Sequence, residues 1–199
     1  MSNWTYTIGD GYYYNHMTLT QNALNIKAFF EEHYPNMTSE AIIGIIANME
    51  HESYLNPGQQ EHGYNGSTSK GYGLVMWTPA RSKILSYATD AGGNWYDGDL
   101  QLEYCRTSIP SGWIVSQAYP YTWAQYQTLN DYNEATRAFF YNFERGTWHS
   151  ELDIYSAFWA NELYGDTPPT PDPPLPPSPV EEDEDLLLWL VMFLCKFFK

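Results

Sequence analysis

The sequence predicts a mainly α-helical (α+β) domain, in which a helical body carries a small lobe of strands and loops. Segments with apolar residues at helical spacing recur between residues 19 and 165, separated by glycine and proline. The most apolar of them, residues 41–57, has the pattern of a buried helix. The composition then changes abruptly to proline-rich, so we expect the domain to occupy residues 1–165.

Length and charge exclude several classes of protein. A chain of 199 residues suits one domain with an appendage. The net charge is −15 and there is no basic cluster, which argues against nucleic-acid binding. Cys105 and Cys195 form no disulfide framework. The first residues carry no basic and apolar signal, so export by the usual secretory route is not expected.

Aromatic residues are abundant, with 18 Tyr, 9 Phe and 8 Trp. Most are explained by a core, but so many Tyr and Trp also suit a cleft that stacks on sugar rings. Tyr12, Tyr13 and Tyr14 have the same two interpretations, packing against the body or lining a cleft. The alternation in residues 4–8 predicts a short strand before them.

The first two helices are predicted from periodicity and capping residues. Residues 21–33 form an apolar face after Thr20, a suitable N-cap, and Pro35 ends the helix. The second helix begins at Thr38 or Ser39 and is the central buried helix. Gly44 in its middle allows a neighbouring element to approach closely.

A loop and a short extended segment follow this helix. Residues 58–70 are polar and rich in turn residues, and a long polar loop in a compact domain is often functional. We expect a flap there. Residues 71–79 combine two glycines with an apolar run and predict a short strand or an extended turn.

Four further helices are expected before the domain ends. They cover residues 80–89, 99–106 with Asp99 as N-cap, 131–143, and 150–163 followed by Gly165. Residues 110–112 read as a break, and the aromatic stretch 113–126 has no assigned structure.

The sharpest functional candidate is Glu52, in the last turn of the central helix. Burial raises the pKa of a carboxyl group, and an acid that is still protonated near neutral pH can protonate a leaving group. The alternative is an ordinary exposed glutamate at a helix end. Glu50 faces elsewhere and is expected to be solvated. Glu61 and Glu144 are candidate second carboxylates, needed only if the reaction inverts the sugar.

Two other chemistries have weaker support. His51, Glu52, Glu61 and His62 are clustered in sequence, but their spacing is not that of a zinc motif, and we expect no metal or other cofactor. Cys105 with His149 lacks a recognisable signature of a cysteine nucleophile.

Four segments in this order resemble the phage tail lysozyme family, the peptidoglycan-degrading domain of tail-tip proteins of short-tailed phages. They are MTSEAIIGIIANMEHESYLNP, GYGLVMWTPARSKILSYATDAGG, QLEY and FFYNFERG. The resemblance covers about residues 19–165. It implies the lysozyme-like fold shared by goose-type lysozymes and lytic transglycosylases, and an enzyme that is a muramidase or a lytic transglycosylase.

The resemblance also implies roles for individual residues. Glu52 matches the glutamate of the family's ES pair and would be the general acid. The segment lining the sugar cleft is matched by Gly71, Tyr72, Gly73, Leu74, Trp77 and Thr78. Glu144 matches the acidic position of a YER segment, which supports the cleft or the fold. Met76 stands where Gln is usual, which puts a polar contact to the substrate in doubt.

The C-terminal part is expected to serve delivery. Residues 166–185 form a proline-rich and acidic linker, and Leu186–Lys199 is an apolar segment. As a helix of roughly 21 Å this segment is too short to span a bilayer core of ~30 Å. It either packs among other tail proteins in an oligomeric tail knob, inserts in the host membrane, or anchors one partner.

The resemblance thus implies a multi-copy virion enzyme acting on peptidoglycan during genome ejection. The rival is a structural or membrane-active tail-knob plug with an inactive lysozyme-like body.

Overall fold

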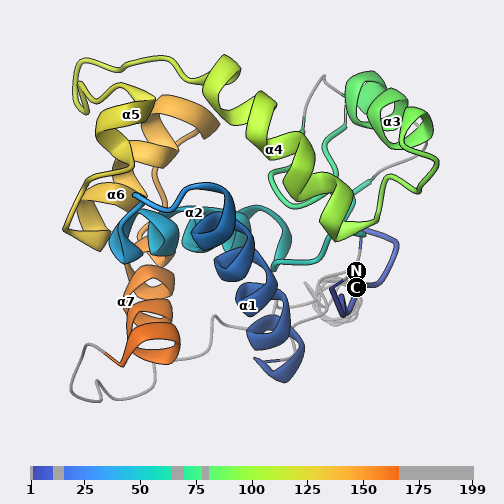
Figure 1. Ribbon diagram of the computed structural model, residues 1–199, viewed down its shortest axis with the longest axis horizontal. Helices are drawn as coiled ribbons and strands as arrows, with labels where there is room; N and C mark the ends of the chain where they lie inside the picture. Colours follow the sequence, from blue (N-terminus) through green and yellow to red (C-terminus); the bar gives the residue numbers. More distant parts are fainter. Residues whose placement is uncertain (1, 11–15, 64–69, 78–80, 166–199) are drawn as a thin grey trace, which may run out of the picture. The chain divides into compact units, whose positions relative to one another are not determined.

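The computed structural model describes residues 2–10, 16–63, 70–77 and 81–165 (Figure 1). The linker and apolar segment expected at 166–199, and Tyr12, Tyr13 and Tyr14, lie outside these residues. The predicted mainly helical class is confirmed. The helices are α1 (His16–His33), α2 (Ser39–Ser53), α3 (Arg81–Asp90), α4 (Gly98–Gly112), α5 (Trp123–Tyr126), α6 (Tyr132–Phe139), the π-helix η1 (Phe140–Glu144) and α7 (Glu151–Tyr164).

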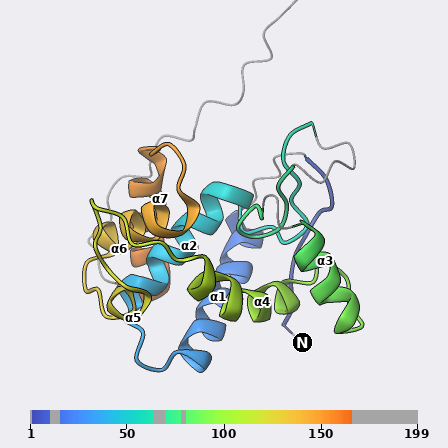
Figure 2. The same cartoon turned by 90° about the horizontal axis from the view of Figure 1, so that it is seen from above.

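Helix α2 is the central element, as the sequence predicted. It lies among α1, α6 and α7 in both views (Figures 1 and 2), and residues 41–50 are buried without interruption. The Thr38 hydroxyl accepts a hydrogen bond from the amide of Ala41 at 3.2 Å, which confirms the predicted N-terminus. Tyr54 adopts a left-handed conformation with φ 53° and ends the helix.

Gly44 permits the close packing of α2 against α6. A Cβ atom at this position would lie 2.8 Å from the backbone carbon of Ala135 and 2.9 Å from the hydroxyl of Tyr126. That hydroxyl donates to the carbonyl of Ala41 at 2.7 Å, so the same contact carries a buried hydrogen bond. The glycine is therefore required by packing rather than by backbone conformation.

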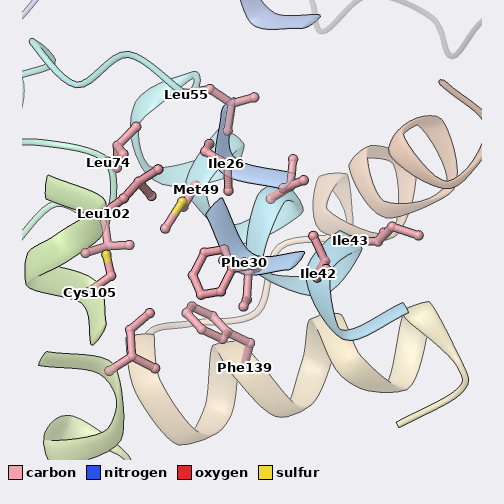
Figure 3. Close-up of a cluster of buried hydrophobic side chains, with 14 of the residues drawn as sticks. Ile26, Phe30, Ile42, Ile43, Met49, Leu55, Leu74, Leu102, Cys105 and Phe139 are labelled. Carbon is pink, nitrogen blue, oxygen red and sulfur yellow. The ribbon is translucent and has the colours of Figure 1, made fainter. Parts of the chain in front are cut away.

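The core is one cluster assembled from several helices. Figure 3 shows side chains of α1, α2, α4 and α6 meeting in it, among them Phe30, Met49, Cys105 and Phe139. All four are at most 1% exposed. Because six residues of α2, from Ala41 to Met49, belong to this cluster, packing fixes the orientation of the helix.

Several predicted boundaries are wrong. Helix α1 begins at His16, so Thr20 lies inside it rather than at its cap. Residues 4–8 form no strand, and the nearest β contact is an isolated bridge between Gly9 and Gln59. Residues 71–77 form turns with a single bridge from Tyr72 to Gln60, so of the two predicted alternatives the turn is present and the strand is not. In the described residues the β structure is therefore limited to bridges.

Helix α4 differs from its prediction at both ends. Its N-cap is Asp97, whose carboxylate accepts from the amides of Asp99 and Leu100. The Asp99 carboxylate instead accepts hydrogen bonds from the amide of Ser2 and the indole N–H of Trp4, both at 2.8 Å. The helix also continues through Pro110, which lies in its last turn, to residue 112. Among the described residues, no helix has the length and apolar character needed to cross a bilayer.

Candidate active site

Glu52 lies in the last turn of α2, half-buried. Burial raises the pKa of its carboxyl group to about 7. Because the group retains some exposure, the acid is accessible as well as protonated near neutral pH. These are the two properties that a general acid requires. The position and environment expected of Glu52 are thus present, and its catalytic role stays a prediction.

Ser53 joins the end of α2 to the segment 70–77. Its hydroxyl lies 2.8 Å from the carbonyl oxygen of Met49 and 3.0 Å from that of Leu74, both fully buried contacts. Gln101 of α4 holds the same segment from the other side, since its Oε1 accepts from the amide of Leu74 at 2.8 Å. Its amide nitrogen donates to the carbonyl of Pro57 at 2.7 Å. The chain that follows Glu52 is therefore anchored by buried hydrogen bonds.

Sequence reasoning included Gln101 in the resemblance but gave it no role. Its amide is completely buried and connects the loop after α2 to the segment 70–77. No local signal in the sequence reports this role, because the burial that requires the Gln101 amide to be hydrogen-bonded arises from tertiary packing.

The segment expected to line the sugar site is placed close to α2, but mostly inside the protein. Tyr72 is 2% exposed and Leu74 is 0% exposed, so these side chains belong to the core. Gly71 and Gly73 are buried too, and Gly73 has φ +82°, which a side chain would strain. Any contact of this part with a sugar would come from the backbone.

Trp77 is the residue of this segment with an unused polar group. Its ring is 6% exposed and packs edge-on against Tyr104, with ring centres 5.4 Å apart. Its indole N–H is buried and has no hydrogen-bond partner among the residues that the structure describes. Thr78, the last of the predicted substrate contacts, lies outside the described residues. The substrate-binding role of this set stays a prediction.

Glu61 is held in an ion pair. Its Oε1 lies 2.8 Å from the Lys70 ammonium, and its Oε2 accepts from the amide of Gly71 at 2.8 Å. The hydrogen bond from Lys70, followed by that from Gly71, lowers the pKa of this carboxyl group. Glu61 thus fastens the two ends of the loop 61–70 together.

Glu144 is the last residue of η1 and half-buried, with its Oε1 completely enclosed. Burial raises the pKa of this carboxyl group well above its ordinary value, and the charge of Glu52 raises it further. Arg145 lowers it by a smaller amount. The structure therefore brings Glu52 and Glu144 within electrostatic reach of each other, as a pair that cannot easily hold two negative charges.

The prediction that Glu50 is solvated is wrong. Glu50 is 1% exposed, and its carboxyl oxygen accepts from the indole N–H of Trp159 in α7 at 2.6 Å. Burial raises the pKa of Glu50 to about 8, against the opposing effect of the Trp159 hydrogen bond. The two acids of the last turn therefore face different surroundings: α7 covers Glu50, and Glu52 retains exposure beside Glu144.

The described residues form neither a metal site nor a site for a cysteine nucleophile. The described residues contain no group of three His, Cys, Asp or Glu side chains able to hold a metal ion. His51 contacts His149, with ring centres 4.8 Å apart. Cys105 is fully buried, and burial raises the pKa of its thiol, so it is not an activated nucleophile.

Comparison with known proteins gives two findings. The family model for phage tail lysozyme matches residues 21–165. Morphogenesis protein 1 of Bacillus phage B103 is 44% identical to this chain over 66 residues, which are 33% of this chain and 18% of that protein. The matched region thus spans less than a fifth of that relative's length.

Proposed function

Because the chain belongs to the phage tail lysozyme family, we propose that it is a peptidoglycan glycosidase of the virion. In this proposal it sits at the phage tail tip and cleaves the bond between N-acetylmuramic acid and N-acetylglucosamine in the host wall during genome ejection. The observation that carries the proposal is Glu52, a half-buried acid at the end of the central helix with a pKa raised to about 7.

The proposed reaction begins with protonation of the glycosidic oxygen by Glu52. The O–H bond of the acid breaks as the C–O bond to the leaving sugar lengthens, and the muramic acid ring develops positive charge at C1. The Glu52 carboxylate then accepts a proton from the incoming nucleophile. A water molecule gives hydrolysis, and the C6 hydroxyl of the same sugar gives a 1,6-anhydro product.

The surroundings of Glu52 support this role. The buried hydrogen bonds of Ser53 and Gln101 hold the acid and the segment 70–77 in one arrangement, which is the positioning that proton transfer requires. The indole N–H of Trp77, which has no partner in the described part of the chain, is a donor suited to a sugar hydroxyl or acetamido oxygen. Glu61 forms an ion pair with Lys70, so in this proposal it has a structural role and takes no part in the reaction.

One observation favours the rival function, a structural or membrane-active tail-knob plug with an inactive body. Met76 replaces the glutamine usual at this position and has φ 44°, a conformation uncommon for a residue with a side chain. In either function Leu186–Lys199 is proposed to bind other tail proteins, with the host membrane as the alternative partner.

Incubation of the purified full chain with peptidoglycan tests the proposal. We expect soluble glycan fragments, and the end group of the products distinguishes hydrolysis from lytic cleavage. A folded protein that releases no fragments from walls of its own host would contradict the enzyme and favour the plug.

A further inference from the structure

The position of Glu144 is rigidly determined by the π-helix that ends at it. The amide of Arg145 donates to the carbonyl of Phe140 at 2.7 Å, closing the wide turn, and Arg145 has φ 61°. Asn142, two residues before Glu144, is completely buried, and its side chain bonds the backbones of Ser116 and Tyr119 at 2.8 and 2.9 Å. The backbone that carries Glu144 is therefore held in place by this network.

The surroundings of the Glu144 carboxyl group disfavour a charge. Its Oε1 is enclosed and has no hydrogen-bond partner in the described part of the chain. The groups that interact with it electrostatically are Glu52 of α2, Cys105 of α4 and the neighbouring Arg145. The side chain of Arg145 is exposed and donates its Nε–H to the carbonyl of Phe143 at 3.2 Å. No donor among the described residues is thus placed to stabilise a negative charge on this Oε1 atom.

A neutral carboxyl group has different chemistry from an ionised one. It cannot accept a proton from water, so Glu144 is unsuited to the role of a second, water-activating carboxylate. It carries an O–H that can donate. An anionic acceptor that interacts electrostatically with Glu144 arises during the proposed reaction, when Glu52 loses its proton.

We propose that Glu144 is a positioning residue that remains protonated and donates a hydrogen bond, directly or through one water molecule, to the Glu52 carboxylate formed during cleavage. The inference rests on the proposed function of Glu52. The proton of Glu52 moves to the leaving oxygen, whereas the O–H bond of Glu144 stays intact throughout. The donated bond stabilises the anion as it forms, and it is stronger in the transition state than in the ground state.

Two substitutions in the full chain separate this role from the alternatives. Glu144→Gln keeps a donor without an ionisable group, so we expect kcat within about threefold of the unmodified protein and an unchanged pH profile. Glu144→Leu removes the donor, and we expect kcat to fall roughly ten- to a hundredfold with little change in KM. The alkaline limb of the pH–rate profile of this variant should move to higher pH, because the ionised form of Glu52 has lost its hydrogen bond.

Two kinetic outcomes would overturn the proposal. If Glu144→Gln is as inactive as Glu144→Leu while both remain folded by circular dichroism, Glu144 acts as an ionised base. If Glu144→Leu has the kcat and pH profile of the unmodified protein, Glu144 only fills space.

A measurement that needs no activity completes the test. In protein labelled with ¹³C at the glutamate carboxyl groups, the resonance lost in Glu144→Gln identifies Glu144. We expect this resonance to stay at the shift of a protonated acid while that of Glu52 titrates. Titration of Glu144 together with Glu52 or before it would refute the proposal. If the resonances behave as expected but the unmodified protein cleaves no peptidoglycan, the proposed function fails separately.

Discussion

Glu50 and Glu52 are two residues apart in the last turn of α2, yet their side chains lie on opposite faces of the helix. On the Glu50 face, α7 covers the acid completely and Trp159 supplies one hydrogen bond. On the Glu52 face the acid is half-buried, beside Glu144 and the segment held by Ser53. Burial raises the pKa of both acids, to about 8 and about 7.

The two glutamates show that a raised pKa and access to a substrate are separate properties. A raised pKa alone would select Glu50 more strongly than Glu52, because its shift is larger. Glu50 has no route to a substrate, however, so its protonation serves the contact between α2 and α7. A perturbed pKa is therefore informative about function only where the group can also be reached.

The largest expected effect is on activity. Glu52→Gln removes the proton donor, and we expect the rate of peptidoglycan cleavage to fall roughly a hundred- to ten-thousandfold with little change in the unfolding midpoint. Glu50→Gln is the matched control from the same helical turn, and it should retain most of the activity per folded molecule. A reversed result would exchange the roles assigned to the two faces.

The next effect is on stability, and it belongs to Glu50. The carboxyl group titrates near 4.5 in the unfolded chain and near 8 in the folded protein, so between these values only the folded protein holds the proton. The contribution of this group to the free energy of unfolding is fully present below about pH 4.5 and is lost as the pH rises through 8. Glu50→Gln should remove this loss and stabilise the protein at pH 7 by up to about 3 kcal/mol.

Urea unfolding of the unmodified protein and of Glu50→Gln at several pH values measures this difference. The two free energies of unfolding should diverge as pH rises. If the two free energies of unfolding instead change in parallel with pH, Glu50 is ionised in the folded protein. The protonation state assigned to Glu50 in the comparison with Glu52 would then be wrong.

A smaller effect is expected in the pH dependence of cleavage. Glu52 acts in its protonated form, so the rate should decline about tenfold per pH unit above its pKa of about 7. Rates measured between about pH 5 and pH 9 on a substrate of constant charge would show this limb. A rate that increases through this range would indicate that an ionised group controls the reaction instead.

The smallest effect is expected from Trp159→Phe. The change removes the donor to the Glu50 carboxyl group and should cost about 1–2 kcal/mol of unfolding free energy. Cleavage by the folded fraction should be unaffected, since Trp159 lies on the covered face. If the rate fell as far as in Glu52→Gln, the two faces would not be independent.

The sequence predicted those features that local rules determine. The cap at Thr38, the close approach at Gly44 and the stop at Gly165 follow from residue chemistry, and all three are present. The position of Glu52 in the last turn followed from periodicity and from the ordered motifs around it.

Features determined by distant residues were missed. The covering of Glu50 depends on Trp159, 109 positions later, and no local pattern reports that contact. The cap of α4 was misassigned by two residues because Asp97 and Asp99 are equally suitable by type, and Trp4 occupies the second. The π-turn at Phe140–Glu144 inserts one residue into a helical pattern, which periodicity cannot distinguish from an ordinary helix end.

The bond between Trp159 and Glu50 has a consequence for the order in which the protein matures. Helix α2 is complete at residue 53, but the helices that bury it, α6 and α7, end at residues 139 and 164. During synthesis at about 5–20 residues per second, the α2 segment therefore remains without these partners for roughly 5–20 seconds, and a helix of this length is only marginally stable alone. Because such distant contacts form late, Glu50 acquires its raised pKa only when the domain is almost fully made. Glu52, the proposed general acid, is thus synthesised long before α7, the last of the helices around α2.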